Sequence, residues 1–188
     1  AFSLERKKVV KGNPTFFTDK EYLRIEKAAV GHPLFPMIVT ARYTGLRLAE
    51  LIHLEWQDFD WQKREVNVRN KPEMNHTVKT YEERAVPICE ELIFKLLPYR
   101  KDTGLCFPVF FGKNKGGIYS YQGPKDSINS LLKEAGLKEV GEAWHKFRRT
   151  FASRLVQNGA DIYAVSRWLG HSSVAVTEKH YACFKGQY

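Results

Sequence analysis

Two arginines of this sequence stand where a guanidinium group could meet an anion. Arg148 belongs to a predicted helix and lies close to its apolar stripe, and a cation held against an apolar surface needs an anionic partner such as a phosphate oxygen. Arg47 follows the break at Thr44-Gly45-Leu46 and begins another predicted helix, where backbone N–H groups also favour an anion. Each arginine considered alone has an ordinary alternative. Arg148 is also consistent with a surface arginine, and Arg47 is also consistent with an arginine that forms an ion pair with Glu50.

Two histidines and a tyrosine could supply proton transfer and a nucleophile. His145 precedes Arg148 by three residues, so both lie on one side of the same helix. His171 follows a glycine at the start of a later helix, where the positive end of the helix dipole disfavours a charged imidazole. Tyr181 lies on that later helix, and its hydroxyl is a weak nucleophile at the usual tyrosine pKa of about 10, which neighbouring cations would lower. A hydrogen-bonded turn histidine and a packed tyrosine are the ordinary alternatives, and Tyr188 is a rival nucleophile.

The elements that must position these residues include a small sheet in the first half of the chain. Residues 64–68 alternate between polar and apolar side chains with the two-residue period of a strand. Residues 78–80 and 84–87 are predicted as two further short strands. Together they predict a three-stranded antiparallel sheet within residues 60–88, with Lys79 at its tip or edge, where a lysine is usually solvated.

The rest of the chain is predicted to be helical. A capping box at residues 18–21 begins the first helix, and glycines end several of the others. The predicted fold is mainly α with a small three-stranded antiparallel sheet (α+β), in one domain over residues 15–188 that follows a basic arm at residues 1–14. The predicted helices cover residues 18–30, 34–43, 47–54, 90–97, 124–135, 144–157 and 161–169, and a last helix capped by Ser172-Ser173 carries Tyr181.

The composition is that of a folded, basic protein. Of 188 residues, 43% are hydrophobic, which is enough for a packed core and excludes a disordered chain. Lys and Arg number 30 against 21 Asp and Glu, and the net charge of +9 indicates a polyanionic partner, most simply nucleic acid. The three cysteines form no CxxC pair, which disfavours a zinc–thiolate site and fits a reducing intracellular setting. No apolar run approaches the roughly 18 residues of a membrane span, and the first residues lack the apolar core of a signal peptide.

The order of the candidate residues, and the residues around them, carry more information than any one of them. The segments that hold them read TGLRLAEL, VKTYEERAVPI, HKFRRTFASRL and WLGHSS, and Tyr181 follows. With these segments in this order, residues 15–185 resemble the catalytic domain of the tyrosine recombinase (phage integrase) family. The positions that match the family's site are Arg47, Lys79, His145, Arg148, His171 and Tyr181.

The resemblance implies a role for each of these residues. Arg47 and Arg148 would bind the non-bridging oxygens of the scissile phosphate and neutralise the charge of the pentavalent transition state. Lys79 would protonate the leaving 5′ oxygen, with Lys71 as a rival for that position. Tyr181 would attack phosphorus and form a 3′-phosphotyrosyl link to DNA.

The remaining polar residues would have supporting roles. His145 would assist proton transfer and hydrogen-bond the phosphate, and His171 would donate a second hydrogen bond to it. Glu50 would support the site without reacting. The expected contacts to the DNA backbone come from Arg149, which occupies a place often taken by histidine, and from Lys146 and Lys179.

The resemblance also implies a reaction without a cofactor or a metal. Because the tyrosyl ester keeps the energy of the phosphodiester bond, the exchange needs neither ATP nor a metal ion. The sequence has no P-loop and no pair of close carboxylates suited to two magnesium ions. The expected partner is double-stranded DNA, on which a full-length protein would act as a tetramer, while this chain alone could be a monomer. The expected location is the cytoplasm, at the nucleoid when bound to DNA.

Three features depart from the family's usual pattern. Ten positions separate His171 from Tyr181, one more than is common. The amino-terminal core-binding domain of most members has no counterpart in residues 1–14. Only seven residues follow Tyr181, so we expect most of the tail that usually docks on a neighbouring protomer to be missing.

Two other functions stay open at this stage. A non-catalytic DNA-binding module of the same fold would bind DNA without cutting it, and a type IB topoisomerase-like enzyme would nick and close DNA by the same chemistry. A metal-dependent hydrolase built on His145, His171 and His180 is disfavoured, because the sequence has no HExxH motif and no matched carboxylates.

Overall fold

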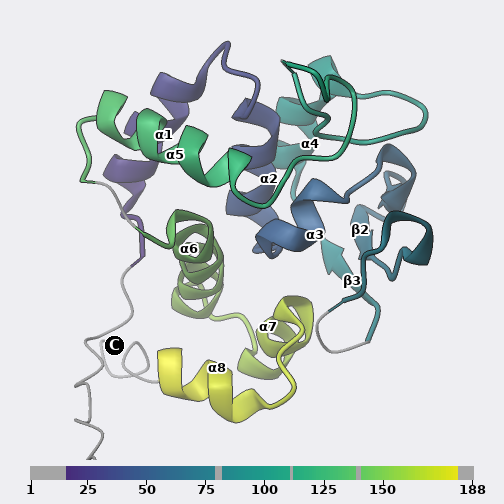
Figure 1. Ribbon diagram of the computed structural model, residues 1–188. Helices are drawn as coiled ribbons and strands as arrows, with labels where there is room; N and C mark the ends of the chain where they lie inside the picture. The colour runs from purple at the N-terminus through teal and green to yellow at the C-terminus, as the bar shows by residue number, and fades with distance from the viewer. Residues whose placement is uncertain (1–15, 79–81, 111, 139–140, 182–188) are drawn as a thin grey trace, which may run out of the picture.

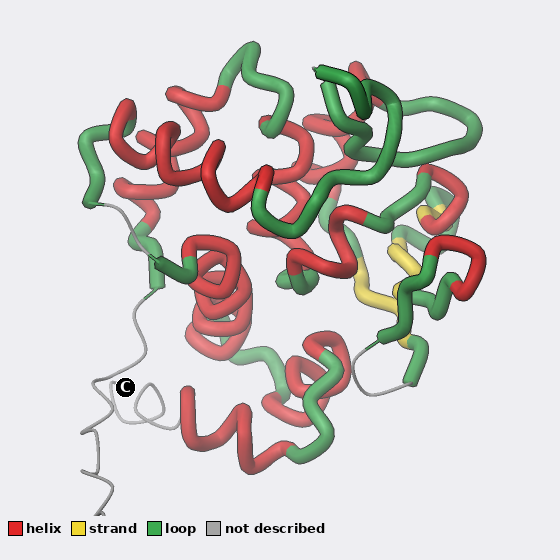
Figure 2. The backbone as a smooth tube through the Cα atoms, in the orientation of Figure 1, coloured by secondary structure: helices red, strands yellow, loops and turns green. Residues whose placement is uncertain are grey.

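The computed structural model describes residues 16–78, 82–110, 112–138 and 141–181, with the backbone alone for Val176 and residues 179–181. The fold is mainly helical with one small sheet, as the sequence predicts (Figures 1 and 2). Within those residues, no helix combines the length and the apolar character that crossing a membrane requires. The α-helices are α1 (Asp19–Ala29), α2 (Phe35–Thr44), α3 (Leu48–Ile52), α4 (Glu90–Leu96), α5 (Gly123–Glu134), α6 (Ala143–Gln157), α7 (Ile162–Leu169) and α8 (Val174–Tyr181).

Helix α1 begins with the predicted capping box. The hydroxyl of Thr18 accepts a hydrogen bond from the N–H of Glu21 at 3.2 Å, and the carboxylate of Glu21 accepts one from the N–H of Thr18 at 2.7 Å. Two N–H groups without partners inside the helix are satisfied in this way. The helix then buries Tyr22, Ile25 and Ala29, and it packs on α2 and α5.

Helix α2 forms the centre of the core. Most of its residues are buried, and α1, α3, α4 and α6 all pack against it. It ends at Gly45, which has a left-handed conformation (φ 63°). A Cβ atom at Gly45 would lie 2.5 Å from Cδ1 of Phe151 on α6, so this position needs glycine for its conformation and for its space. The close approach brings the segment before Arg47 directly against α6.

The sheet has three antiparallel strands in the order β1 (Phe59–Asp60), β2 (Glu65–Val68) and β3 (Arg84–Pro87). The register pairs Phe59 with Val66, and Val66 with Val86. Two of the three predicted strands, 64–68 and 84–87, are confirmed as β2 and β3, but Val78, the start of the predicted strand at 78–80, lies outside every described strand. The rest of the predicted strand at 78–80 lies outside the described residues, and the missed strand is β1, whose two residues are too few to show a period.

The elements divide the molecule into two ends joined by α6. Figure 1 shows α1, α2, α4 and α5 at one end and α7 and α8 at the other, with α6 between them. Helices α7 and α8 pack on each other and on α6, and α7 also packs on β3. The candidate residues therefore come from elements that meet where α6, α7 and the turn before α3 approach one another.

Candidate active site

Helix α6 places Arg148 at the buried boundary of its apolar face. Phe147 and Phe151 are buried on that face, and Arg148 is 6% exposed. Its guanidinium donates hydrogen bonds to the carbonyl oxygens of Gly45, at 2.8 Å, and of Leu169. The alternative of an ordinary surface arginine is therefore wrong, because the side chain is held between two other elements of the fold.

Arg47 stands at the first position before α3 and reaches across to α7. Its backbone N–H donates to Oε2 of Glu50 at 2.7 Å, and its Nη1 pairs with Oε1 of the same carboxylate at 3.0 Å. Its Nη2 donates to the carbonyl oxygen of Gly170 at 2.8 Å. The predicted ion pair with Glu50 is present, and it aims the guanidinium at the end of α7.

Glu50 is a buried carboxylate among arginines. Its residue is 4% exposed. Burial by itself would raise its pKa, but the hydrogen bond and charge of Arg84, with the nearby charge of Arg148, hold the pKa of Glu50 below its usual value. The carboxylate is therefore ionised and can fix two guanidinium groups at once.

His145 lies one turn from Arg148 at the open side of α6. Partial desolvation of the ring lowers the pKa of His145 from its ordinary 6.5, and the charges of Arg148, Arg149 and Arg47 lower it further against an opposing effect of Glu142. The imidazole is therefore neutral at pH 7, the form that can accept a proton.

His171 connects α7 with the helix that carries the candidate nucleophile. Its Nδ1 lies 2.7 Å from Oγ1 of Thr177, a fully buried residue of α8. The predicted cap of α8 is present at Ser173, whose hydroxyl accepts from the N–H of Ala175 at 3.2 Å. Tyr181 is the last residue of α8, and its side chain lies outside the described part of the structure.

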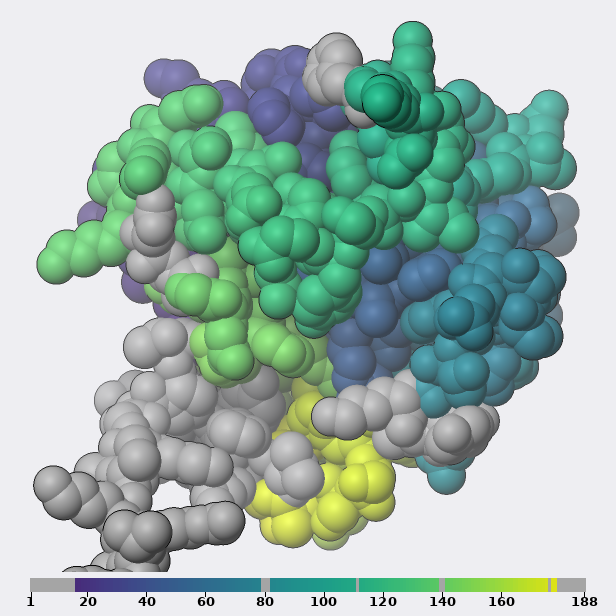
Figure 3. Space-filling view, in the orientation of Figure 1, coloured from purple at the N-terminus to yellow at the C-terminus, as the bar shows by residue number. Residues whose placement is uncertain are grey.

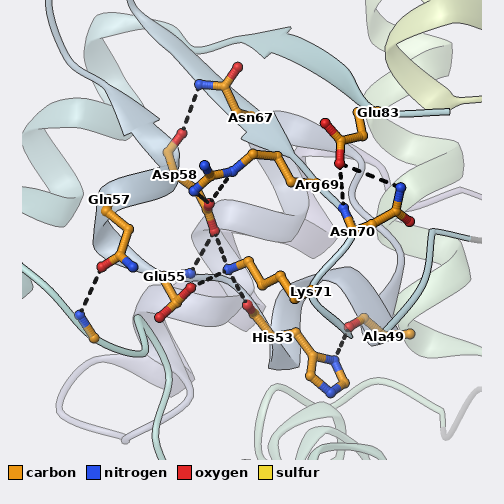
Figure 4. Close-up of polar contacts among 11 residues, drawn as sticks. Ala49, His53, Glu55, Gln57, Asp58, Asn67, Arg69, Asn70, Lys71 and Glu83 are labelled. Carbon is orange, nitrogen blue, oxygen red and sulfur yellow. Dashed lines mark hydrogen bonds and ion pairs between the residues drawn. The ribbon is translucent and has the colours of Figure 1, made fainter. Parts of the chain in front are cut away.

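The structure describes only one of the two lysines considered as the proton donor. Lys79 lies outside the described residues. Lys71 is buried, and its ammonium group donates to Asp58 at 2.6 Å, to the carbonyl of His53 at 2.7 Å and to Glu55 at 2.8 Å (Figure 4). Since all three ammonium hydrogens have acceptors, this geometry argues against Lys71 as a proton donor to a substrate.

The three residues expected to contact the DNA backbone lie on α6 and α8. Arg149 forms an ion pair with the exposed carboxylate of Glu142 at 3.7 Å. The ammonium group of Lys146 lies 4.2 Å from the centre of the Phe17 ring. The side chain of Lys179 lies outside the described part of the structure.

A pocket of about 330 Å³ opens beside Arg47 and His145. Its walls come from α3, α5 and α6 and from the segment of His76, and they include Tyr121 and Lys125. Figure 3 shows the surfaces of the α3 region in blue, α6 in light green and α8 in yellow meeting on one face of the molecule. Among the described side chains, no three His, Cys, Asp or Glu groups are close enough to hold a metal ion.

Sequence reasoning missed Arg84 as part of this arrangement. From β3, its Nη2 donates to Oε2 of Glu50 at 2.8 Å and its Nε donates to the carbonyl oxygen of Trp168 at 2.7 Å. A signal was present in the strand pattern, because Arg84 shares a face of β3 with the buried Val86. A charged residue on the buried face of a strand requires a partner, which the folded chain supplies in Glu50.

The fold and these residues define a known class of protein. The model of the phage integrase family matches residues 16–185, so the chain belongs to the phage integrase family. The residues that match include all of the described structure and every site candidate except the rival nucleophile Tyr188.

The similar proteins are tyrosine recombinases by name. The chain is 30% identical over 192 residues to the tyrosine recombinase XerC-like protein of Caldanaerobacter subterraneus subsp. tengcongensis. This alignment covers 88% of this chain and 49% of that protein. It is 32% identical over 142 residues to the tyrosine recombinase XerC of Staphylococcus aureus, covering 73% of this chain and 44% of the relative. The chain thus spans about half the length of these relatives.

Solved structures of the same fold include two well-covered matches. The crystal structure of XerA recombinase has a TM-score of 0.73 at 29% identity, over 90% of this chain and 61% of that one. A lambda integrase dimer bound to a COC′ core site has a TM-score of 0.71 at 19% identity, over 98% of this chain and 52% of that one. The predicted fold, a tyrosine recombinase catalytic domain, is confirmed.

Proposed function

We propose that this chain is the catalytic domain of a site-specific tyrosine recombinase, which cuts and rejoins DNA through a 3′-phosphotyrosyl intermediate on Tyr181. The observation that carries the proposal is the convergence of three candidate residues on one turn. The guanidinium of Arg148 donates a hydrogen bond to the carbonyl of Leu169, and that of Arg47 donates one to the carbonyl of Gly170. His171 is the next residue in the sequence. The family membership and the names of the relatives support the same reaction.

The chemistry assigned to these residues is a transfer between two phosphoesters. The Tyr181 oxygen forms a bond to phosphorus as the bond to the 5′ oxygen breaks, and the phenolic proton leaves through a nearby base. Arg47 and Arg148 place two positive charges beside the non-bridging oxygens, where negative charge builds in the transition state. Lys79 supplies the proton to the leaving 5′ oxygen, and the neutral ring of His145 assists proton transfer. The reverse reaction with a second 5′ hydroxyl rejoins the strand.

Double-stranded DNA is the substrate in this proposal. The net charge of +9 favours a polyanion, and integrases in complex with DNA are among the solved structures of this fold. We infer that the longer protein to which such a domain belongs assembles as a tetramer on two duplexes. The relatives named above come from bacteria, whose DNA lies in the cytoplasm, and we infer that this protein also acts in the cytoplasm, at the nucleoid.

A covalent-trapping experiment tests the proposal. The protein is incubated in EDTA with supercoiled plasmid and with a pool of nicked duplexes of randomised sequence, and the mixture is quenched with SDS. We expect a protein–DNA band that protease removes and that Tyr181→Phe abolishes while DNA binding persists. Tyr163→Phe on α7, where the ring is exposed, is the matched control and should leave the band intact.

Each other result selects a different conclusion. A band that persists in Tyr181→Phe would overturn the assignment of the nucleophile. Relaxation of the plasmid without any strand exchange would indicate a topoisomerase-like activity. DNA binding with no band in the unmodified chain would favour a non-catalytic module.

A further inference from the structure

The end of α7 is held by three arginines from three different elements. The carbonyl oxygens of residues 168, 169 and 170 accept hydrogen bonds from Arg84 on β3, Arg148 on α6 and Arg47 before α3, in that order. The last carbonyls of a helix have no partners inside the helix and form the negative end of its dipole, so guanidinium groups stabilise them. Two of these arginines belong to the proposed site, but nothing in that reaction uses Arg84.

We propose that Arg84 is a positioning residue, which aligns Arg47 and His171 by tying Glu50 to the end of α7. The inference rests on the function proposed above. Arg84 is 8% exposed at its side chain, and it bonds Glu50 through Nη2 and Trp168 through Nε. It therefore acts on the reaction through its neighbours and not through substrate.

The contacts of Glu50 explain how Arg84 controls Arg47. Oε2 of Glu50 accepts from Arg84 and from the backbone N–H of Arg47, while Oε1 pairs with Nη1 of Arg47. The carboxylate charge is thus shared between two guanidinium groups. Without Arg84, the whole charge of Glu50 faces Arg47, which strengthens that ion pair and draws the guanidinium away from a bound phosphate.

The packing around Gly170 explains how Arg84 controls His171. A Cβ atom on Gly170 would lie 3.0 Å from Nη1 of Arg84, so the guanidinium lies directly against the residue that precedes His171. Gly170 has a left-handed conformation (φ 61°), which turns the chain from α7 toward α8. Removing the guanidinium leaves the turn without its support from β3.

The cost of burying Arg84 indicates that this residue positions its neighbours and does not serve mainly to stabilise the fold. Nη1 of Arg84 is buried and has no hydrogen-bond partner among the described residues. A buried charge with an unsatisfied donor is a costly way to stabilise a fold, and apolar residues often replace such groups without loss of stability. Arg42 offers a matched comparison, because it is also buried and ion-paired and has an unsatisfied Nε, but it lies on α2.

The first test compares Arg84→Met, Arg84→Lys and the control Arg42→Met at a temperature where thermal melting shows all three folded. We measure the first-order rate of covalent complex formation at saturating DNA, together with DNA affinity. We expect Arg84→Met to lower the rate about 100-fold, as a misplacement near 1 Å does, while DNA affinity falls by about tenfold, because only the contact to the scissile phosphate is weakened. Arg84→Lys should recover part of the rate, because one ammonium can reach one of the two acceptors, and Arg42→Met should keep the wild-type rate.

A double-mutant cycle with His171→Ala separates positioning from a general structural defect. If Arg84 acts through His171, its loss costs much less when His171 is already absent, so the two rate effects fail to multiply. Rate effects that multiply fully in the cycle, or an Arg84→Met rate equal to that of Arg42→Met, would overturn the inference.

The second test does not require DNA cleavage. Inorganic phosphate is titrated into protein with ¹³C-labelled histidine, and the His171 signal is followed by NMR after assignment with His171→Gln. We expect phosphate to shift this signal in the wild type and in Arg42→Met, and to bind at least tenfold more weakly in Arg84→Met. A wild type that binds phosphate but forms no covalent complex would refute the proposed function and leave the role of Arg84 standing. Equal phosphate binding by Arg84→Met, or no binding by the wild type, would overturn the role of Arg84.

Discussion

The ring of His171 shows how one hydrogen bond can decide what a side chain offers a substrate. Its Nδ1 is 2.7 Å from the hydroxyl of the fully buried Thr177. If that hydroxyl donates to Nδ1, the ring carries a proton on Nε2, which makes Nε2 the hydrogen-bond donor of the ring. The bond also couples the turn after α7 to α8, the helix that ends at Tyr181.

A substitution at Thr177 tests this reasoning. Thr177→Val keeps the shape of the side chain and removes the hydroxyl, so we expect the rate of covalent complex formation to fall about tenfold, as it does when a partner that orients a histidine is lost. Thr177→Ser keeps the hydroxyl and is the control, with a rate near that of the wild type. Equal rates for the valine and serine variants would show that the ring needs no such partner.

His76 makes stability depend on pH. Its ring is stacked on His53 with the centroids 4.3 Å apart, and burial, together with the charges of His53 and Lys71, lowers the pKa of His76 below 6.5. The unfolded chain therefore binds the proton more readily, and the stability present above pH 6.5 is lost as the pH falls through the lower, folded pKa.

We expect the free energy of unfolding to decrease below about pH 6.5. His76→Phe keeps an aromatic ring in the stack and removes the titrating group, so it should reduce this decrease. The free energy of unfolding at pH 8, measured with denaturant, reports the loss of contacts alone. The change in this free energy between pH 8 and pH 5.5 reports the titration of the ring. A variant with the same pH dependence as the wild type would assign the effect to other groups, such as His145, whose pKa is also lowered.

At the scale of elements, a buried ionic cluster holds the base of the sheet. Asp58 is 1% exposed and accepts from Lys71 at 2.6 Å and from the Nε of Arg69 at 3.0 Å, as Figure 4 shows. Asn70 then fixes both sides of the following loop, because its Oδ1 accepts from the N–H of Val78 and its own N–H donates to Glu83. In the sequence Lys79 lies between Val78 and Glu83, the two residues that Asn70 binds. We therefore expect the cluster to influence the position of Lys79.

Lys71→Met therefore distinguishes a structural lysine from a reacting one. Removing one member of a buried ion cluster leaves uncompensated charge, and we expect a loss of about 3–5 kcal/mol in the free energy of unfolding. Lys63→Met is the control, because Lys63 is 74% exposed in its ion pair with Asp60 and should cost less than about 1 kcal/mol. A stable Lys71→Met that has lost DNA cleavage would instead make Lys71 the proton donor.

Local signals predicted the helices well and the sheet and site less completely. The capping box at Thr18 and the left-handed glycines at 45 and 170 are short-range features, so the ends of α1, α2 and α7 could be located from the sequence. Strand β1 could not, because it exists only through its pairing with β2. Arg84 escaped for a related reason: its partners are 34 and 84 positions away, and only the folded chain brings them together.

At the scale of the whole molecule, the positive charge predicts a steep dependence of DNA affinity on salt. Each phosphate that the protein neutralises releases condensed counterions, so the logarithm of the binding constant falls with the logarithm of salt concentration by about 0.9 per contact. Arg149 is a proposed backbone contact, and its ion pair with the exposed Glu142 at 3.7 Å is weak enough to be exchanged for a phosphate. Arg149→Gln should therefore reduce the salt slope by about one and weaken binding to all sequences alike.

The control for this prediction separates a contact from net charge. Lys63→Gln removes one positive charge from an exposed side chain next to the sheet, and it should leave the salt slope unchanged. Fluorescence anisotropy with one duplex, at several salt concentrations, measures both variants and the wild type. If both variants reduce the slope equally, the charge of the molecule acts as a diffuse field and Arg149 makes no particular contact. A wild-type affinity that does not change with salt would remove the electrostatic argument for DNA as the partner, because a protein of charge +9 that binds phosphates must release counterions.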